Sequence, residues 1–502
     1  MEHKTYTYEN SRRLFERALK VIPSGVYGHQ GPAEGCFIPV DAFPFFSERA
    51  QGAYFWDADG NRFIDYMCAY GPNILGYGDP DVDEAARRQR EKEDCVTAPS
   101  PVMIDFAELL VDTVQTADWA FFAKNGNDVT TLAVMTARAF TRRKKIVFFK
   151  GYYHGVSPWT QKIDYSGVLK EDVCNNLYAD WNDFEGLEAL FEAHKGEIAA
   201  VISQPYMHGN FADNELPADG FWQKVRRLCT EQGALLIVDD VRAGFRLSLA
   251  GSDSYFGFEA DLICFCKAIA NGYNVSALCG RDFLKNTVSG ISFTGSYWLS
   301  AVPFAAGIAC LEKMKKLDLP ELLIEKGKRL TDGLTAAARK HGYDLRASGV
   351  PSLFYLRIAD DDNLMTHQRF IAEMVRRGVY MTNHHNHFIN YALSDADIDE
   401  TVEIADEVLR LLESMTQSGT GMTVSLLFSP SKPSTHTRSL RSLATISRSP
   451  QTAKSRGQQP PQGKRRSRTG PSGVGLQTAM TSSPRRETNS RPPSSDSRMA
   501  PA

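Results

Sequence analysis

The sequence predicts an α/β protein with a mostly parallel central sheet covered by helices, followed by a smaller α+β domain. Between residues 144 and 267, short apolar segments alternate with helical segments. Strands that are apolar along nearly their whole length are typical of parallel sheets with both faces buried. After about residue 300 the pattern changes to long helices and short strands, which indicates a second domain.

The expected elements follow from the spacing of the apolar residues. Residues 10–25 have the spacing of an amphipathic helix, which Pro23 and Gly25 end. Residues 52–67 have the pattern of two short strands joined by a DADG turn. The sheet strands are expected at 144–151, 197–205, 234–240 and 260–267, and further helices at 101–115, 221–233 and 395–415.

Composition separates an acidic body from a basic tail. The chain has 57 Lys and Arg and 60 Asp and Glu, of which residues 416–502 hold 14 and 2. This tail is rich in Ser, Pro and Arg and nearly lacks aromatic residues, so it buries too little apolar surface to fold. We therefore divide the chain into an N-terminal helix and arm (1–50), a large cofactor-binding domain (51–300), a small C-terminal domain (301–415) and a disordered tail (416–502).

The composition also bears on location and partners. No segment approaches the roughly 20 apolar residues that span a membrane, and the N-terminus lacks the apolar run of a secretory signal. Nine scattered cysteines without a CxxC pair indicate reduced thiols. The basic run 463–468 has the composition of a nuclear-import or nucleic-acid patch, but a solvated tail is the favoured interpretation. We expect a cytoplasmic protein with no membrane or nucleic-acid partner.

An acid and a lysine are expected at neighbouring strand ends. Asp239 ends the apolar run 234–240, and Lys267 ends the run 260–267. Ligands of such sheets bind at the carboxyl ends of the strands. A buried ammonium group is strongly disfavoured unless it is paired or neutral, so Lys267 is expected to be a reactive amine.

Pyridoxal phosphate is the cofactor that these residues fit best. Its aldehyde needs an amine, which Lys267 supplies, and its pyridine nitrogen needs a fixed carboxylate, which Asp239 supplies. Its phosphate needs N–H groups at the start of a helix, which the NGND turn at 125–128 provides. Tyr153 is expected to stack on the ring, with His154 beside it.

The chain resembles the class III aminotransferase family of fold-type I pyridoxal-phosphate enzymes, and within it the glutamate-1-semialdehyde aminomutase branch. The similarity runs from about residue 8 to 415 and includes the segments KNGNDVTTLAVMTARAFT, FKGYYHG, IVDDVRAGFR, CKAIANG and GSYWLSAVPFAAG. It implies that Lys267 is the Schiff-base lysine and Asp239 the partner of the pyridine nitrogen, in agreement with the residues themselves.

The resemblance also implies cofactor contacts and a homodimer. Thr294 and Ser296 match the segment that reaches the phosphate from the neighbouring subunit, so shared active sites are implied. The Asn127 amide takes the place of a hydroxyl that the family usually has in its phosphate turn, and an amide still donates a hydrogen bond. The expected cofactor-binding residues are Asn125, Gly126, Asn127, Tyr153, His154, Asn210, Asp239, Lys267, Thr294 and Ser296.

One departure from the family concerns the substrate. The aminomutase branch carries an arginine shortly after its PxGV segment, where it binds the substrate carboxylate, but this chain has Tyr27, His29 and Gln30 there. Arginine is the best clamp for a carboxylate, so its absence argues against glutamate-1-semialdehyde as substrate. The expected substrate-pocket residues are Tyr27, His29, Tyr70, Trp159 and Arg242.

Several of these assignments have structural alternatives. Tyr70 and Trp159 would serve equally well as core residues, and Arg242 either binds a carboxylate or forms an ion pair with Asp240. The NHHNH segment, with His384, His385 and His387, suggests a metal site, but no acidic or cysteine partner stands at a useful spacing. We expect no metal, and the family resemblance implies a place for this segment at the rim of the pocket.

We predict an aminotransferase that moves an amino group between an amino compound and a keto or aldehyde acceptor in a ping-pong reaction. The alternative is an aminomutase, which would use the same residues on a single substrate. A non-catalytic binding protein is a third hypothesis, against which the intact Lys267–Asp239 pair argues.

Overall fold

The computed structural model describes residues 3–417 except 24, 27–41 and 45. The chain divides into two units, residues 1–423 and 424–502, of which the second lies outside the described residues. The predicted tail 416–502, except residues 416 and 417 at the end of a helix, and the pocket residues Tyr27 and His29 also lie outside them. Within the described ranges, no helix is long and apolar enough to cross a membrane.

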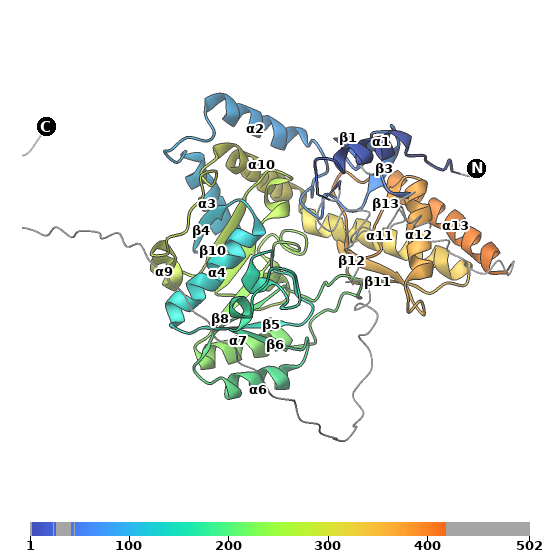
Figure 1. Ribbon diagram of the computed structural model, residues 1–502. Coiled ribbons are helices and arrows are strands. Elements are labelled where there is room, and N and C mark those ends of the chain that lie inside the picture. The colour runs from blue at the N-terminus through green and yellow to red at the C-terminus, as the bar shows by residue number, and fades with distance from the viewer. Residues whose placement is uncertain (1–2, 24, 27–41, 45, 418–502) are drawn as a thin grey trace, which may run out of the picture. The chain divides into compact units, whose positions relative to one another are not determined.

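A seven-stranded sheet forms the centre of the described chain (Figure 1), with the strand order β4-β10-β9-β8-β7-β5-β6. Neighbouring strands run parallel, except that β10 is antiparallel to both β4 and β9. The strands are β4 (Trp119–Ala123), β5 (Lys145–Phe149), β6 (Asn176–Ala179), β7 (Ile198–Ser203), β8 (Leu235–Asp239), β9 (Leu262–Phe265) and β10 (Ser276–Gly280). The predicted α/β class with a mostly parallel sheet is confirmed.

Helices pack on the sheet and make up much of the C-terminal part. The longer helices are α1 (Glu9–Ala18), α2 (Pro80–Lys92), α3 (Val102–Thr113), α4 (Gly126–Thr141), α6 (Phe184–Ala193), α7 (Phe221–Gln232), α10 (Ala301–Leu317), α11 (Leu319–Lys340), α12 (Met365–Arg376) and α13 (Asp395–Gln417). The shorter ones are α5 (Lys170–Val173), α8 (Ser252–Tyr255), α9 (Lys285–Ser289), η3 (Pro158–Thr160), η4 (Lys267–Ala270) and η5 (Asp282–Leu284).

The two faces of the central sheet are buried in different clusters. In β8, Leu235 and Ile237 pack in one cluster with residues of α4, whereas Leu236 and Val238 pack in another with residues of α7. Successive side chains of a strand point to opposite faces, so a strand covered on both sides must be apolar throughout. This explains the continuous apolar run that predicted β8.

Two smaller sheets complete the described chain. The first has the order β1-β2-β3-β13, and the second β11-β12-β14. Their strands are β1 (Ser47–Gln51), β2 (Tyr54–Asp57), β3 (Arg62–Asp65), β13 (Val379–Tyr380), β11 (Leu345–Val350), β12 (Leu353–Ile358) and β14 (His387–Phe388). The pairing of β3 with β13 joins a segment of the predicted large domain to one of the predicted small domain. The domain division therefore stays a prediction.

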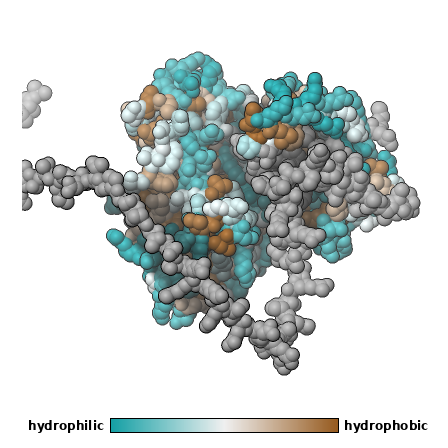
Figure 2. Space-filling view, in the orientation of Figure 1, coloured by the Kyte–Doolittle hydropathy of each residue, from teal (hydrophilic) through white to brown (hydrophobic). Residues whose placement is uncertain are grey.

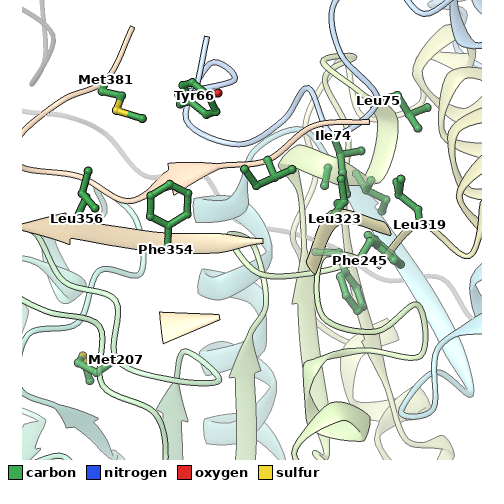
Figure 3. Packing of buried hydrophobic residues seen from close by; sticks show 14 of the residues in the cluster. Tyr66, Ile74, Leu75, Met207, Phe245, Leu319, Leu323, Phe354, Leu356 and Met381 are labelled. Carbon is green, nitrogen blue, oxygen red and sulfur yellow. The ribbon is translucent and has the colours of Figure 1, made fainter. Parts of the chain in front are cut away.

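One apolar cluster continues from the central sheet to the smaller sheets (Figure 3). Tyr66 follows β3, Phe354 lies in β12 and Met381 follows β13, and all three are at most 1% exposed. On the face drawn in Figure 2, the coloured surface is mostly hydrophilic, with hydrophobic residues in small patches. The central sheet and residues of the smaller sheets therefore share one apolar core.

The packing of β8 predicts a stability effect. Replacing Ile237 by Ala removes buried methyl groups and leaves a cavity beside α4, which should lower the free energy of unfolding by about 2–5 kcal/mol. The change should appear as a lower melting temperature in a thermal scan. Lys195→Ala on the exposed surface is the control, and equal melting temperatures for both variants would contradict the assignment of Ile237 to the core.

Candidate active site

The pairing of β8 with β9 brings Asp239 and Lys267 to the same edge of the central sheet. The two strands run parallel with Asp239 opposite Cys264, and Lys267 follows three residues after Cys264. The end of β4 leads into the turn that opens α4, and the end of β5 leads into the segment with Tyr153 and His154. These segments follow the carboxyl ends of strands, where ligands of such sheets bind.

The Lys267 amine is chemically unusual. The backbone of Lys267 has φ +49°, a left-handed conformation that is uncommon outside glycine and concentrates at functional sites. Burial lowers the pKa of the amine to about 7, and the nearby Arg242 guanidinium acts in the same direction. Nζ donates no hydrogen bond to a described residue. Lys267 therefore offers an amine that is neutral in about half of the molecules at pH 7 and that donates no hydrogen bond to the described part of the chain.

Contacts to both carboxylate oxygens fix the side chain of Asp239. Its side chain is 5% exposed, Oδ1 accepts a hydrogen bond from the Val241 N–H at 3.1 Å, and Oδ2 lies 2.7 Å from Nδ1 of His154. The His154 ring stacks on Tyr152, with the centroids 5.2 Å apart. The structure thus places His154 as a support for the carboxylate, whereas the sequence suggested a cofactor contact.

The turn before α4 lies directly against the end of β8. A Cβ atom on Gly126 would lie 2.8 Å from Cγ1 of Val241, so this approach requires glycine. The Asn125 N–H donates to the Asp128 carboxylate at 2.9 Å. The first N–H groups of a helix lack intrahelical partners and attract anions. The turn is therefore suited to a phosphate group close to Asp239.

The Asn127 side chain has a different role from the one its sequence position suggests. Its Oδ1 accepts hydrogen bonds from the N–H groups of Val156 and Ser157, both at 2.9 Å, and its Nδ2 donates to Ser157 Oγ at 2.9 Å. The expected amide donor to a phosphate is thus already engaged. Asn127 instead ties the turn to the segment that carries Tyr153 and His154, and its backbone N–H remains for an anion.

Tyr153 presents an accessible aromatic ring at this edge. Its side chain is 51% exposed. Burial of the remaining surface raises the pKa of its phenol, and the charges of Arg242 and Asp239 act on it as well. A half-exposed ring so close to the carboxylate is well placed to stack on a planar ligand.

Three other predicted cofactor contacts are exposed in a single chain. Thr294 and Ser296 lie before α10, and no described side chain donates to either side-chain oxygen. Asn210 is exposed as well, whereas His208, two residues earlier, is buried. The structure therefore does not bring Asn210 into the buried part of the site.

The two aromatic pocket candidates have different surroundings. Tyr70 meets His385 edge to face, with ring centroids 4.9 Å apart. Trp159 donates from Nε1 to Thr131 Oγ1 at 3.2 Å and packs against Phe148 in the cluster beneath the sheet. The structure thus favours the core alternative for Trp159 and places Tyr70 beside the NHHNH segment.

Arg242 does not form the ion pair with Asp240 that was one alternative. Asp240 instead accepts hydrogen bonds from the N–H and Oγ of Ser252, at 2.9 and 2.6 Å. Nη1 of Arg242 donates to the backbone oxygen of His208 at 2.7 Å and to Oδ1 of Asn386 at 2.6 Å. The guanidinium is therefore fixed by neutral acceptors.

Sequence reasoning missed His208 and Asn386. His208 is 1% exposed, and its Nδ1 lies 3.1 Å from Nε2 of Gln204. Asn386 is fully buried within the NHHNH segment, and the neighbouring His385 has its pKa lowered by burial and by Arg242. The only signal for Asn386 in the sequence was its place as a polar residue inside the NHHNH segment.

Among the described residues, no three His, Cys, Asp or Glu side chains are grouped so as to hold a metal ion.

Comparisons with known proteins identify the family of the chain. The model of the family "Aminotransferase class-III" matches residues 38–409. The aminopentol aminotransferase of Sphingopyxis macrogoltabida is 43% identical over 393 residues, which cover 78% of this chain and 92% of that protein. A glutamate-1-semialdehyde 2,1-aminomutase of Francisella philomiragia is 35% identical over 421 residues, covering 78% and 96%.

A solved structure gives the same result. The FumI protein of Sphingopyxis sp. MTA144, in its PLP internal aldimine form, has a TM-score of 0.79 and 41% identity, and the match covers 81% of this chain and 97% of that one. An amine, a fixed carboxylate, an anion-binding turn and an aromatic ring together fit pyridoxal phosphate. The fold and the site thus define a fold-type I enzyme that uses this cofactor. The chain belongs to the class III aminotransferase family and is an aminotransferase of that family.

The lowered pKa of Lys267 predicts a pH dependence. Because burial and Arg242 disfavour the charged form, the cofactor-free protein should have a neutral Lys267 amine above about pH 7. Its modification by trinitrobenzenesulfonate, followed by peptide mapping, should therefore rise with a midpoint near pH 7. Removing the positive charge with Arg242→Met should move that midpoint upward. A midpoint above about 10, as in an exposed lysine, would contradict the account.

Proposed function

We propose that this aminotransferase takes its amino group from a hydroxylated amine and passes it to a separate carbonyl acceptor. The observation that carries the transfer itself is the unpaired Lys267 amine beside the fixed carboxylate of Asp239. The donor class is supported by the 43% identity to an aminotransferase named for an aminopentol, a compound with one amino group and several hydroxyl groups.

The polar atoms around the site are suited to such a donor. Nε2 of His208 and Oε1 of Gln204 are buried and have no hydrogen-bond partner among the residues that the structure describes. An unpaired buried polar atom is costly, and a substrate hydroxyl that reaches it removes that cost. Because burial and Arg242 lower the pKa of His208, its ring is neutral and accepts or donates a hydrogen bond without adding charge.

The chain's residues have distinct roles in the proposed reaction. When bound, pyridoxal phosphate supplies a carbonyl carbon that exchanges amines and a pyridine ring that withdraws electrons. Lys267 Nζ would hold that carbon when the cofactor is bound, and as a free amine it would take the proton from the substrate carbon that bears nitrogen. Asp239 would keep a proton on the ring nitrogen, and His154 would keep Asp239 oriented. Tyr153 would cover the ring face, and the N–H groups after Asn125 would bind the phosphate.

An intramolecular aminomutase remains the second candidate, supported by the 35% identity to a glutamate-1-semialdehyde 2,1-aminomutase. The Lys267 and Asp239 roles would be the same. The absence of an arginine after the PSGV segment favours the aminotransferase, since Tyr27, His29 and Gln30 stand there. We also retain a cytoplasmic location as a proposal, on the basis of the cysteine usage.

Amino transfer in two halves predicts a spectroscopic cycle. Adding a hydroxylated amine such as sphinganine to the cofactor-loaded enzyme should abolish its visible absorption band, and adding pyruvate afterwards should restore it. Lys267→Ala should abolish turnover, and Asp239→Asn should lower kcat by about 10²–10³-fold, as for the loss of one key electrostatic contact. Turnover of a single amino compound with no acceptor would instead indicate the aminomutase.

We further propose a homodimer with shared sites, because Thr294 and Ser296 are exposed in the single chain and resemble the segment that reaches a neighbouring cofactor. Mixing inactive Lys267→Ala with inactive Ser296→Trp tests this. If the sites are shared, each mixed dimer contains one site with both native residues, so about a quarter of the native activity should return after random exchange. If Ser296 serves its own chain, no mixture should regain activity.

A further inference from the structure

Arg242 is a buried cation that forms no ion pair with any described residue. The residue is 8% exposed. Its only hydrogen bonds to described residues are the two from Nη1 to neutral oxygens, and it forms no ion pair with a described carboxylate. Asp239 acts on its charge, but that carboxylate is already bonded to His154 and to the Val241 N–H. Nε and Nη2 thus keep their hydrogen-bonding capacity, and neither is among the fully buried unpaired atoms.

The guanidinium remains charged despite its burial. Burial lowers the pKa of Arg242, but only to about 10, so the group is a cation near neutral pH. A buried charge without a counter-charge is strongly unfavourable, and such a charge is retained at sites that bind the opposite charge. Arg242 lies three residues after the carboxyl end of β8, at the edge that carries Asp239, and its charge acts on the pKa of Lys267 and of Tyr153.

A chain of hydrogen bonds fixes the direction of the guanidinium. Asn386 accepts from Arg242 Nη1 through Oδ1, and its Nδ2 donates to Oδ1 of Asn214 at 2.6 Å. Asn214 in turn donates from Nδ2 to the backbone oxygens of Ser348 in β11 and Leu353 in β12, at 3.2 and 3.3 Å. With one nitrogen anchored to a rigid sheet, the remaining N–H groups are oriented in advance, which is what precise ligand binding requires.

We propose that Arg242 binds the carboxylate of a 2-oxo acid, which makes it the residue that selects the amino-group acceptor. Carboxylates are the anions that match the guanidinium fork. The inference rests on the proposed function, in which a hydroxylated amine without a carboxylate is the donor. In a ping-pong reaction both substrates use the same site in turn. The neutral atoms of His208 and Gln204 therefore bind the hydroxyl groups of the donor, and Arg242 binds the carboxylate of the acceptor.

The overall reaction balances without a further reagent. The donor loses one C–N bond and becomes a ketone or aldehyde, and the 2-oxo acid gains one C–N bond and becomes an amino acid. The electron pair that the donor carbon gives up with its C–H bond is balanced by the pair that the acceptor carbon receives, and protons balance through Lys267 and water. The acceptor oxygen leaves as one water, and the oxygen of the new carbonyl on the donor carbon comes from another water, so no net water is consumed. The carboxylate is unchanged throughout, so Arg242 acts by binding alone.

The test compares two acceptors in the cofactor-loaded enzyme. With one fixed amine donor, kcat/KM is measured for pyruvate and for propanal, which lacks the carboxylate. Arg242→Met should lower the value for pyruvate about 10- to 100-fold more than the value for propanal, as for the loss of a charged hydrogen-bond pair; the change with propanal reports the separate effect of Arg242 on the pKa of Lys267. Arg242→Lys, which keeps the charge but not the fork, should fall between the two.

Two controls separate binding from structural damage. Arg226→Met removes a cation that is already paired, with Asp261 at 2.7 Å, and should not alter the preference between the acceptors. Propionate, a carboxylate without a reacting carbonyl, should inhibit the donor half-reaction of the native enzyme and inhibit Arg242→Met about 10-fold less. The affinity of each variant for pyridoxal phosphate is measured separately.

The outcomes distinguish a failure of the role proposed for Arg242 from a failure of the proposed function. Equal losses for pyruvate and propanal, unchanged inhibition by propionate, or a loss explained by weaker cofactor binding would overturn the role of Arg242. A native enzyme that transfers no amino group to either acceptor would overturn the proposed function instead. Asn386→Ala should weaken pyruvate binding less than Arg242→Met does, because it releases the guanidinium without removing it.

Discussion

The parallel pairing of β8 with β9 is the constraint on which the rest of the site depends. It sets Asp239 opposite Cys264 and so brings Lys267 to the same edge of the sheet. A register shift of one residue would turn alternate side chains to the other face, and the apolar clusters on both faces prevent such a shift. The core of the protein thus determines where its reactive amine and its carboxylate lie.

The charged groups at this edge of the sheet have different electrostatic roles. The Asp239 carboxylate is hydrogen-bonded to His154. Burial and Arg242 lower the pKa of the Lys267 amine, whereas the Arg242 guanidinium keeps its charge. One cation therefore lowers the pKa of the nucleophile and also remains available for an anion. The hydrogen bonds through Asn386 keep that cation in place without adding a carboxylate that would neutralise it.

The sequence predicted the parts of the fold that depend on local pattern, and it missed those that depend on distant contacts. The apolar runs at β7, β8 and β9 require burial on both faces, so they identified the parallel sheet correctly. Strand β10 was not predicted, because SALCG is short and made mostly of small residues. The pairing of β3 with β13 joins segments more than 300 residues apart, and no local signal reveals it.

The same limit applies to the site. Asp239 and Lys267 were predicted because each ends an apolar run, and the family, the cofactor and the aminotransferase activity were predicted correctly from motifs around them. The contacts of Asn127 with Val156 and Ser157, and of Arg242 with Asn386, arise only when separate loops meet in the folded chain. Individual residue types therefore suggested plausible roles that the folded structure reassigns.

The central claim is that Lys267, rather than another lysine at these strand ends, holds the cofactor. Lys124 is the appropriate competitor, since its buried Nζ has no hydrogen-bond partner within the described chain and burial lowers its pKa to about 8. The direct measurement is borohydride reduction of the protein loaded with pyridoxal phosphate, followed by peptide mass spectrometry. We predict one cofactor label for each chain, attached to Lys267. A label on Lys124, or labels spread over several lysines, would contradict the account.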